Sequence, residues 1–258
     1  MRIDLRQGDC LEVMKDIPDK SIDMILCDLP YGTTACKWDT VIPFEPLWKQ
    51  YNRIIKDNGA IVLFGSEPFS SYLRMSNIKN YKYDWVWNKK KAGNIFLAKY
   101  QPMKIHENII IFGKCKTTYY PIMVERDKIK KSKNYGTGEA MGGNRKREEK
   151  IYVYDKKNPI SILEFSNASQ KGKVHPTQKP VALLEYLIKT YTNENETVLD
   201  NCAGSMSTVI ASTNTNRNCI AIEKDKNYFE IGKKRVIEHL KTNNISANLV
   251  IFDNECAI

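Results

Sequence analysis

Residues 22–31 read Ile22-Asp23-Met24-Ile25-Leu26-Cys27-Asp28-Leu29-Pro30-Tyr31. The first six are largely apolar and predict a buried strand that ends at a turn. The tetrapeptide from Asp28 to Tyr31 therefore follows the carboxyl end of a strand, where open α/β sheets place their ligand crevices. It offers one carboxylate acceptor, a backbone stiffened by proline and one aromatic face. These groups are suited to hold an exocyclic amine and to stack on the ring that carries it.

Outward from this stretch, apolar segments of strand and helix length alternate along the chain. We expect further strands at 3–5, 60–64, 83–87, 108–112, 197–199 and 219–222, and helices near 11–17, 45–55, 181–191, 207–212 and 227–240. Asn58-Gly59 is expected to end the second of these helices. The alternation predicts an α/β fold with a doubly wound, mostly parallel sheet.

The middle of the chain has a different composition. Residues 126–150 contain a charge run at 128–133 and four glycines between Gly136 and Gly143, with little apolar content. Because such a segment has little surface to bury, we expect a mobile loop or a segment that is disordered without a partner. Residues 156–173 also read as irregular.

Positive charge is concentrated in the same region. The chain of 258 residues has a formal net charge of +10, and residues 88–173 hold 20 Lys and Arg against 8 Asp and Glu, so the remainder is nearly neutral. Clustering of this kind indicates a surface that binds phosphates. A solvated, lysine-rich surface without a partner is the alternative.

Composition also limits the class of protein. The hydrophobic content of 42% is enough for a sizeable core, in one α/β domain with an insertion or in two small domains. The first residues lack the apolar stretch of a signal peptide, and no apolar run approaches the roughly 18 residues of a membrane span. The seven cysteines form no CxxC pair. Neither a disulfide framework nor a metal site is therefore predicted, and a reducing, cytoplasmic location is expected.

A second candidate site lies at Asp200-Asn201-Cys202-Ala203-Gly204-Ser205-Met206-Ser207-Thr208, between a predicted strand and a predicted helix. Small residues in such a turn let a nucleotide-like ligand approach the backbone. Glu223 ends the next predicted strand, where a carboxylate can bind ribose hydroxyls. Without a complete GxGxxG, the pattern leaves three options open: a site for S-adenosylmethionine, a site for a nicotinamide cofactor, or a plain turn between strand and helix.

Together these segments resemble four motifs of the β group of S-adenosylmethionine-dependent DNA amino-methyltransferases, which methylate adenine N6 or cytosine N4. Residues 28–31 resemble Asp-Pro-Pro-Tyr, with Leu29 in place of the first proline. Residues 200–208 resemble the cofactor loop Asp-Pro-Phe-x-Gly-Ser-Gly-Thr, with Met206 in place of a glycine. His175-Pro176-Thr177-Gln178-Lys179-Pro180 resembles the motif that flanks the cofactor, and the aspartate of Gly8-Asp9 resembles the residue that contacts its adenine ring. The motifs follow the permuted order of that group.

The resemblance covers nearly the whole chain outside 114–173. It implies a Rossmann-like methyltransferase fold in which 1–113 is the catalytic half, 114–173 a basic target-recognition insertion and 174–258 the cofactor-binding half. It also implies S-adenosylmethionine as cofactor and double-stranded DNA as partner, with the target base flipped out of the duplex. Dimerisation is common in the resembling group, so a homodimer is an open expectation. No membrane partner is expected.

The resemblance assigns roles to individual residues. In the catalytic set Asp28, Leu29, Pro30 and Tyr31, the carboxylate of Asp28 and the carbonyl of Leu29 accept hydrogen bonds from the amine, and Tyr31 stacks on the flipped ring. Contacts to the cofactor are expected from Asp9, Thr177, Lys179, Asp200, Cys202, Gly204, Ser205 and Glu223. The basic region predicts contacts to DNA phosphates from Lys89, Lys90, Lys91, Arg145, Lys146 and Arg147.

Several alternatives stay open. Aspartate at position 28 favours adenine N6, because members with serine there tend to methylate cytosine N4, which remains the alternative. Met206 raises the option of a DNA-binding relic, because a side chain costs about 1 kcal/mol or more where the backbone needs φ > 0. Lys179 could instead be a solvated lysine at a helix start. Core packing is expected for Trp85 and Trp87, structural hydrogen bonds for His106 and His175, and either pocket lining or packing for Phe64, Gly65 and Glu67.

Overall fold

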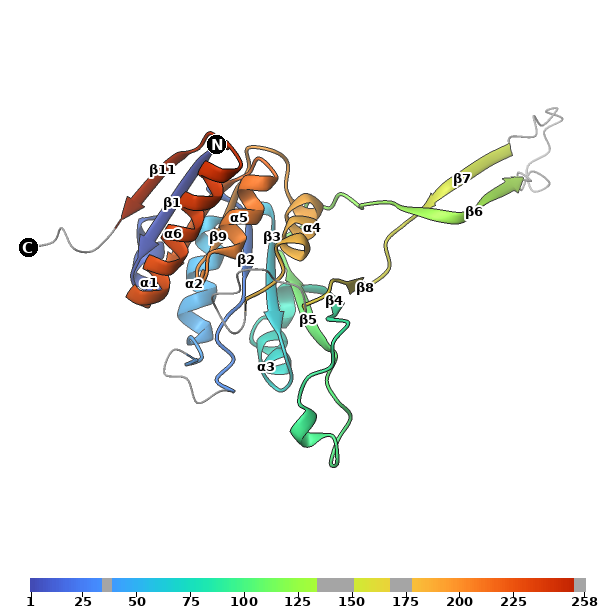
Figure 1. Cartoon of the computed structure of the whole chain (residues 1–258), viewed down its shortest axis with the longest axis horizontal. Helices are drawn as coiled ribbons and strands as arrows, with labels where there is room; N and C mark the ends of the chain where they lie inside the picture. The colour runs from blue at the N-terminus through green and yellow to red at the C-terminus, as the bar shows by residue number, and fades with distance from the viewer. Residues whose placement is uncertain (34–38, 134–150, 168–177, 253–258) are drawn as a thin grey trace, which may run out of the picture. The chain divides into compact units, whose positions relative to one another are not determined.

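A β-sheet organises the larger part of the molecule (Figure 1). The computed structural model describes residues 1–33, 39–133, 151–167 and 178–252. Within them the sheet has nine strands in the order β11-β1-β10-β9-β2-β3-β5-β4-β8, and only β5 runs antiparallel to its neighbours. The strands are β1 (Arg2–Gln7), β2 (Ile22–Cys27), β3 (Ile55–Gly65), β4 (Tyr81–Asn88), β5 (His106–Phe112), β8 (Ile162–Glu164), β9 (Thr197–Asp200), β10 (Asn218–Glu223) and β11 (Asn248–Phe252).

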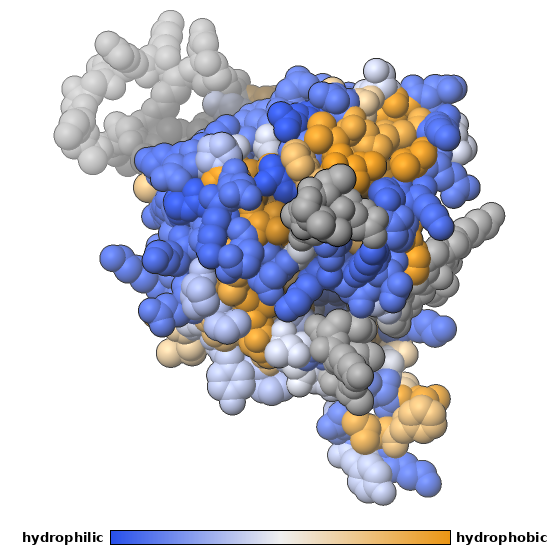
Figure 2. All heavy atoms as spheres, turned by 90° about the vertical axis from the view of Figure 1, so that its left-hand side faces the viewer, coloured by the Kyte–Doolittle hydropathy of each residue, from blue (hydrophilic) through white to orange (hydrophobic). Residues whose placement is uncertain are grey.

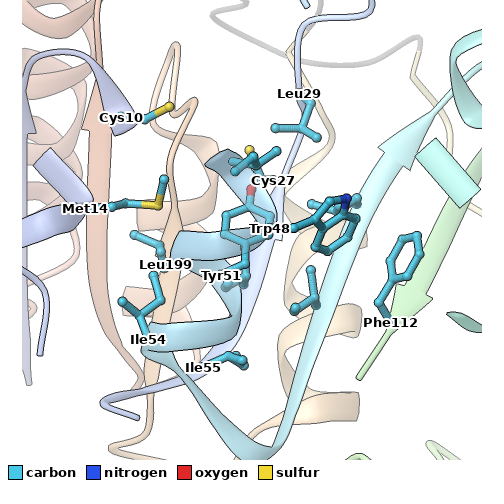
Figure 3. Packing of buried hydrophobic residues seen from close by; sticks show 14 of the residues in the cluster. Cys10, Met14, Cys27, Leu29, Trp48, Tyr51, Ile54, Ile55, Phe112 and Leu199 are labelled. Carbon is cyan, nitrogen blue, oxygen red and sulfur yellow. The ribbon is translucent and has the colours of Figure 1, made fainter. Parts of the chain in front are cut away.

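Helices cover both faces of this sheet. Alternate residues of β2 point to opposite sides: Cys27 packs with Tyr51 (Figure 3), whereas Leu26 packs in the cluster that contains Leu187. One face carries α1 (Cys10–Val13), α2 (Phe44–Ile54) and α3 (Phe69–Ser76), and the other carries α4 (Val181–Tyr191), α5 (Ser207–Asn214) and α6 (Lys226–Thr242). Short 3-10 helices are η1 (Met14–Asp16), η2 (Ile78–Asn80) and η3 (Ile95–Leu97). The predicted doubly wound, mostly parallel α/β fold is confirmed.

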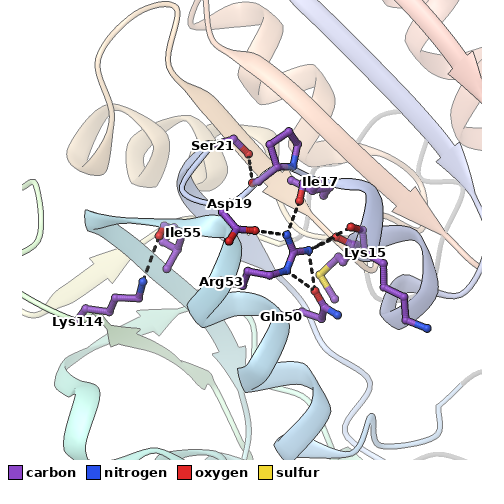
Figure 4. Close-up of polar contacts among 10 residues, drawn as sticks. Lys15, Ile17, Asp19, Ser21, Gln50, Arg53, Ile55 and Lys114 are labelled. Atoms are coloured by element: carbon purple, nitrogen blue, oxygen red, sulfur yellow. Dashed lines mark hydrogen bonds and ion pairs between the residues drawn. The ribbon is translucent and has the colours of Figure 1, made fainter.

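Arg53, near the end of α2, fixes the connection that leads into β2 (Figure 4). Its guanidinium donates to the carbonyl oxygens of Ile17 and Met14, both at 2.7 Å, and to Asp19 Oδ1 at 2.6 Å. These bonds satisfy backbone acceptors in a connection that has no ladder of its own. They hold the start of β2 against α2, and thereby the position of the tetrapeptide at the other end of the strand.

The passage from α2 to β3 differs from the sequence prediction. The helix ends at Ile54 and the strand begins at Ile55, so Asn58-Gly59 lies inside β3 and does not end the helix. The pairing of β3 with β2 shifts register between Ile22 and Met24, which accommodates the additional residues as an irregularity of the ladder. A Cβ added at Gly59 would lie 2.8 Å from the Asp23 carbonyl oxygen, so this glycine is needed for the close approach of the two strands.

Residues Pro121–Ile160 form a separate compact unit. In it, β6 (Val124–Lys133) pairs antiparallel with β7 (Ile151–Lys157). The prediction of a mobile or disordered segment is therefore wrong for 126–133, which belong to a strand whose two ends pair with β7. Local composition does not reveal a pairing partner that lies further along the chain. Residues 134–150 lie outside the described residues. The unit falls within the predicted insertion 114–173, whose limits and role stay predictions.

Two edge strands of the nine-stranded sheet are missing from the sequence prediction. The first, β8, lies in the stretch that reads as irregular and pairs with β4; the second, β11, pairs with β1. Both are short and partly exposed, so their apolar periodicity is weak. Among the helices that the structure describes, none combines the length and the apolar composition needed to cross a membrane.

Candidate active site

A cavity of about 880 Å³ lies at the edge of the sheet where the parallel strands end. Asp9 follows β1, Asp28 follows β2, Asp200 ends β9 and Glu223 ends β10, and all four line this cavity. Parallel strands bring their carboxyl ends to the same edge, which explains why residues so distant in the sequence meet. Ligand pockets of drug-sized molecules have volumes of this order, roughly 300–1,000 Å³.

Asp28 has a partner on each carboxylate oxygen. The Tyr31 hydroxyl donates to Oδ1 at 2.8 Å, and the Lys179 ammonium donates to Oδ2 at 2.5 Å. One face of the Tyr31 ring stacks on Phe69, with centroids 4.9 Å apart and 25° between the planes. The carboxylate is thus fixed in orientation, and it keeps a quarter of its side-chain surface exposed in the cavity wall (25%).

A row of alternating charges continues from Asp28. The Lys179 ammonium also lies 3.4 Å from Glu107 Oε2, and the Lys89 ammonium lies 3.0 Å from Glu107 Oε1. Burial raises the pKa of Asp28, and Lys179 offsets part of that rise. Burial also opposes charge on Lys179 and Glu107, but their opposite-charge neighbours outweigh it, so the pKa of Lys179 is raised and that of Glu107 is lowered. Both stay ionised at neutral pH.

The second part of the cavity is built around the turn after β9. Glu223 Oε2 accepts the Gly204 backbone N–H at 2.6 Å, and Glu223 Oε1 accepts that of Asp225 at 2.8 Å. Asp200 Oδ1 accepts the Cys202 N–H at 3.1 Å. Gly204 has φ of 49°, a left-handed conformation that glycine adopts without cost. These bonds connect the ends of β9 and β10 through one turn.

Three carboxylates give this part of the cavity an acidic lining. Burial raises the pKa of Asp200 to about 6 and raises that of Glu223 as well. Burial also acts on Asp9, but hydrogen bonds from Lys224 and the Leu11 N–H outweigh it and lower its pKa. A cation or a hydrogen-bond donor stabilises the charged form of a buried carboxylate. This lining therefore favours a ligand that carries positive charge or several hydroxyl groups.

Met206 occupies the position at which the cofactor-loop motif has glycine. Its φ is 58°, so the backbone there is left-handed, which is the condition under which a side chain at this position costs free energy. Its side chain is fully buried in the cluster with Ile3 and Phe229, and it does not line the cavity. A Cβ added at Gly232 of α6 would lie 2.7 Å from Met206 Cγ, so the absence of a side chain at 232 makes room for the methionine.

Residues behind the cavity wall hold the turn in place. The Tyr51 hydroxyl donates to Asn201 Oδ1 at 2.6 Å, and Arg235 donates to the Ser205 carbonyl oxygen at 2.7 Å and to Ser207 Oγ at 2.9 Å. None of these supporting contacts is predicted from the sequence. They join helices on opposite faces of the sheet to the same turn, so only the folded chain reveals them.

Glu107 is the chief cavity residue that the sequence prediction misses. It stands near the start of β5, and β5 is the antiparallel strand, so the beginning of this strand lies at the edge where its neighbours end. Nothing in the sequence marks the direction of β5. Glu107 before the apolar run of β5 can be assigned to the cavity edge only once that direction is known.

The structure gathers most of the predicted site residues around one cavity. Its lining includes Asp9, Asp28, Leu29, Pro30, Tyr31, Phe64, Lys89, Lys179, Asp200, Cys202, Gly204, Ser205 and Glu223. Gly65 and Glu67 do not line the cavity. Trp85 and Trp87 are both buried in the core as expected, and Trp87 also lines the cavity. Thr177, His175, Arg145, Lys146 and Arg147 lie outside the described residues.

The structure excludes one of the two sequence interpretations of Lys179. Lys179 is buried, which excludes a solvated lysine at a helix start, and its contacts are to Asp28 and Glu107. The prediction that it contacts the cofactor stays a prediction, but its observed partners belong to the catalytic tetrapeptide and to β5.

Beside the cavity, the loop between β4 and β5 combines cations with exposed apolar side chains. Residues 89–105 hold five lysines and no acidic residue. Phe96 is 91% exposed and Tyr100 84%. In Figure 2 this loop is the lowest part of the molecule, where hydrophobic and hydrophilic side chains lie together. Of the predicted phosphate contacts, Lys89 is paired with Glu107, Lys90 with Glu164 at 3.0 Å, and Lys91 is exposed.

Comparison with known proteins decides the family. The N6/N4 methyltransferase family model, described as DNA methylase, matches residues 22–234. This chain belongs to that family. The predicted family and fold are thus confirmed, and the family acts on DNA with S-adenosylmethionine as methyl donor, so the predicted cofactor is confirmed at that level.

Individual relatives agree with this membership. The chain is 29% identical to the DNA adenine methyltransferase YhdJ of Escherichia coli over 89% of its own length and 81% of the relative. It is 27% identical to the type II methyltransferase M.HpaI of Haemophilus parainfluenzae over 89% and 72% of the two chains. Among solved structures, the M1.HpyAVI–SAM complex matches with a TM-score of 0.61 at 25% identity, over 90% of this chain and 99% of that one. The cytosine-N4-specific PvuII DNA methyltransferase matches with a TM-score of 0.66 at 15% identity over 97% and 95%, which shows the shared fold.

Proposed function

We propose that this protein is a site-specific DNA methyltransferase that transfers a methyl group from S-adenosylmethionine to N6 of adenine. The observation that carries the proposal is a single cavity lined both by the tetrapeptide Asp28–Tyr31 and by the turn of Gly204 with its partner Glu223. Adenine is favoured over cytosine by the aspartate at position 28 and by the likeness to a relative named as an adenine methyltransferase.

The residues around the turn fit S-adenosylmethionine. Glu223 is placed to bind ribose hydroxyls, and Asp9 to meet the adenine ring. Asp200 is buried and has no cationic partner among the described residues, so it suits the positively charged end of the molecule. When bound, S-adenosylmethionine supplies an electrophilic methyl group on a sulfonium. The side chain of Met206 points into the core, which argues against a cofactor loop that is blocked at this residue.

The catalytic residues act on the amine of a flipped-out base. A base inside a duplex is out of reach of the cavity, so it must leave the stack. Asp28 and the carbonyl of Leu29 accept hydrogen bonds from the amine, which directs the nitrogen lone pair toward the methyl group. The proton that the amine loses passes to Asp28, whose pKa is raised by burial and which therefore holds a proton more readily than an exposed aspartate. Positioning supplies most of the acceleration.

DNA contacts are proposed for the loop between β4 and β5. Lys90 and Lys91 would meet phosphates, and the exposed rings of Phe96 and Tyr100 would pack on bases or sugars next to the cavity. Lys89 is instead held by Glu107 at the cavity wall. Arg145, Lys146 and Arg147 remain predicted phosphate contacts, and a homodimer remains an expectation of the family resemblance.

The test is methyl transfer from labelled S-adenosylmethionine to unmethylated plasmid DNA, followed by nucleoside analysis. Asp28→Ala is the test variant, and Asp16→Ala is the matched control, because Asp16 is exposed and does not line the cavity. We expect N6-methyladenine from the wild type and from the control, with a loss of at least 100-fold in Asp28→Ala.

Two other results would change the assignment. Label in N4-methylcytosine would keep the mechanism and replace the base, and the family model covers both reactions. Absence of label together with intact DNA binding would support a DNA-binding relic. Calorimetry with S-adenosylmethionine then decides the point, because the relic would not bind it.

A further inference from the structure

The ammonium of Lys179 and the carboxylate of Asp28 form a donor and an acceptor side by side in the cavity wall. Lys179 Nζ lies 2.5 Å from Asp28 Oδ2, and both residues line the cavity. The Lys179 side chain is 9% exposed, and its ammonium lies 5.0 Å from the centroid of the Phe64 ring. A cation so placed is fixed in position, which a solvated lysine would not be.

Counting donors against the described residues leaves at least one N–H of Lys179 for a ligand. An ammonium has three N–H groups. In the part of the chain that the structure describes, its polar partners are the carboxylates of Asp28 and Glu107. Each oxygen of Asp28 has two lone pairs and one donor, from Tyr31 on Oδ1 and Lys179 on Oδ2. Among the described residues, the pair therefore still offers at least one donor and two acceptor sites to the cavity.

This arrangement matches one edge of only two DNA bases. Adenine presents the N6 amine as a donor next to the ring acceptor N1, and cytosine presents the N4 amine next to the ring acceptor N3. Thymine and guanine present the reverse order, a carbonyl acceptor next to a ring N–H donor. An acceptor at Asp28 beside a donor at Lys179 therefore complements adenine and cytosine and opposes thymine and guanine.

Glu107 and Lys89 make this donor dependable. A lysine buried without anionic partners would lose its proton and could then also accept a hydrogen bond. Asp28 and Glu107 together keep Lys179 an ammonium, which can only donate, and Lys89 in turn compensates the charge of Glu107 at 3.0 Å. The four groups alternate in charge along the cavity wall, so each of them has an opposite charge within 3.4 Å.

We propose that Lys179 donates a hydrogen bond to the ring nitrogen next to the methylated amine, N1 of adenine or N3 of cytosine, and that Glu107 is a positioning residue for this donor. The proposal rests on the proposed function and deepens it. Lys179 and Asp28 together read the amine and its neighbouring ring nitrogen, while the size of the cavity must separate adenine from cytosine.

The test is a cycle that combines a protein variant with a modified base. Duplexes carry adenine or 1-deazaadenine, in which a C–H replaces N1, at the single target position. Each is assayed with the wild type and with Lys179→Met, which keeps the length of the side chain and removes the donor. The readouts are kcat/KM for methyl transfer and, independently of turnover, the Kd of each duplex in the presence of S-adenosylhomocysteine. If the product is N4-methylcytosine, the pair is cytosine and 3-deazacytosine.

A hydrogen bond to a charged donor is worth about 1.5–3 kcal/mol, so we expect the deaza base to reduce kcat/KM about 10- to 100-fold in the wild type. Lys179→Met should show a similar reduction of kcat/KM with the normal base. In this variant, the deaza base should lower kcat/KM by no more than about a further twofold. Any intrinsic effect of the deaza substitution on the amine is the same in both proteins and cancels in the cycle. A deaza penalty that persists in Lys179→Met would overturn the proposal and leave Lys179 only a role in orienting Asp28.

Three controls separate the possible failures. A duplex with 7-deazaadenine is changed on the opposite side of the base. Its kcat/KM relative to adenine should therefore be reduced by the same factor in both proteins. If near-UV circular dichroism shows that Lys179→Met does not fold, Lys179→Gln replaces it. This variant retains an amide donor, so the deaza base should still reduce its kcat/KM measurably. A folded Lys179→Gln protein that shows no such reduction would count against the proposal. Glu107→Gln should lower kcat/KM yet preserve the deaza penalty. Absence of methyl transfer by the wild type would refute the proposed function, while the Kd cycle would still decide whether Lys179 contacts the ring nitrogen.

Discussion

Replacing Met206 separates the cost of its backbone conformation from the value of its side chain. The residue has φ of 58° and ψ of 35°, it is fully buried, and its Cγ lies where a side chain at Gly232 would begin. The informative pair of variants is Met206→Ala and Met206→Gly. Both remove the buried side chain, but only glycine adopts the left-handed backbone freely.

The structure sets the expected magnitudes. Truncating a fully buried methionine costs about 2–5 kcal/mol in the free energy of unfolding. A left-handed backbone costs a residue other than glycine about 1–3 kcal/mol, from which the greater freedom of glycine in the unfolded chain removes about 0.5–1 kcal/mol. We therefore expect both variants to be destabilised, and Met206→Gly to be more stable than Met206→Ala by about 1 kcal/mol, the reverse of the order in an ordinary helix.

Urea unfolding followed by circular dichroism measures the free energies, and calorimetry measures the affinity for S-adenosylmethionine. Because the Met206 side chain does not line the cavity, the affinity of Met206→Gly should stay within about threefold of the wild type. Equal stability of the two variants, or greater stability of Met206→Ala, would refute the argument from the backbone. A gain in affinity above about tenfold in Met206→Gly would show that the methionine obstructs the cofactor.

A second substitution at Gly232 tests the contact itself. A Cβ at this position would lie 2.7 Å from Met206 Cγ and 3.1 Å from the Gly204 carbonyl oxygen. Gly232→Ala should therefore destabilise the wild type strongly and the Met206→Gly protein less, with a coupling of about 1 kcal/mol or more. Additive effects would mean that the two residues do not share this space.

Three further predictions concern charge and exposed residues. Because burial raises the pKa of Asp200 to about 6, the protein should lose up to about 2–3 kcal/mol of stability as pH rises from about 4 to 6, and Asp200→Asn should lack this loss when urea unfolding is measured across that range; equal pH profiles would contradict the assignment. Replacing Lys90 and Lys91 by glutamine should reduce the slope of log affinity for DNA against log salt by about 2. Lys89→Gln should change this slope little, because the pair of Lys89 with Glu107 is largely buried, whereas the pair of Lys90 with Glu164 is exposed and can exchange for a phosphate. Phe96→Ala should change the free energy of unfolding by less than about 0.5 kcal/mol yet weaken DNA binding at least fivefold in fluorescence anisotropy, and an unchanged Kd would exclude this loop from the interface.

The sequence by itself was sufficient for the alternation of strands and helices, for the tetrapeptide at the end of β2 and for the cofactor turn between β9 and α5. These features are local: apolar runs bounded by turn residues fix strand ends, and in a parallel sheet a strand end is also a site position. The strand 22–27 is predicted to the residue. In contrast, local signals misplace Asn58-Gly59 and miss β6, because strand pairing overrides turn preference and gives a charged segment a partner.

Only the tertiary structure decided how the charges around Asp28 are arranged. Glu107 reaches the cavity because β5 is antiparallel, and Lys179 reaches Asp28 across 151 residues of sequence. The side chain of Met206 likewise fits into the core only because residue 232, on another helix, is glycine. Strand direction and contacts between distant elements depend on how whole layers pack, and packing is a property of many residues at once that no single motif encodes.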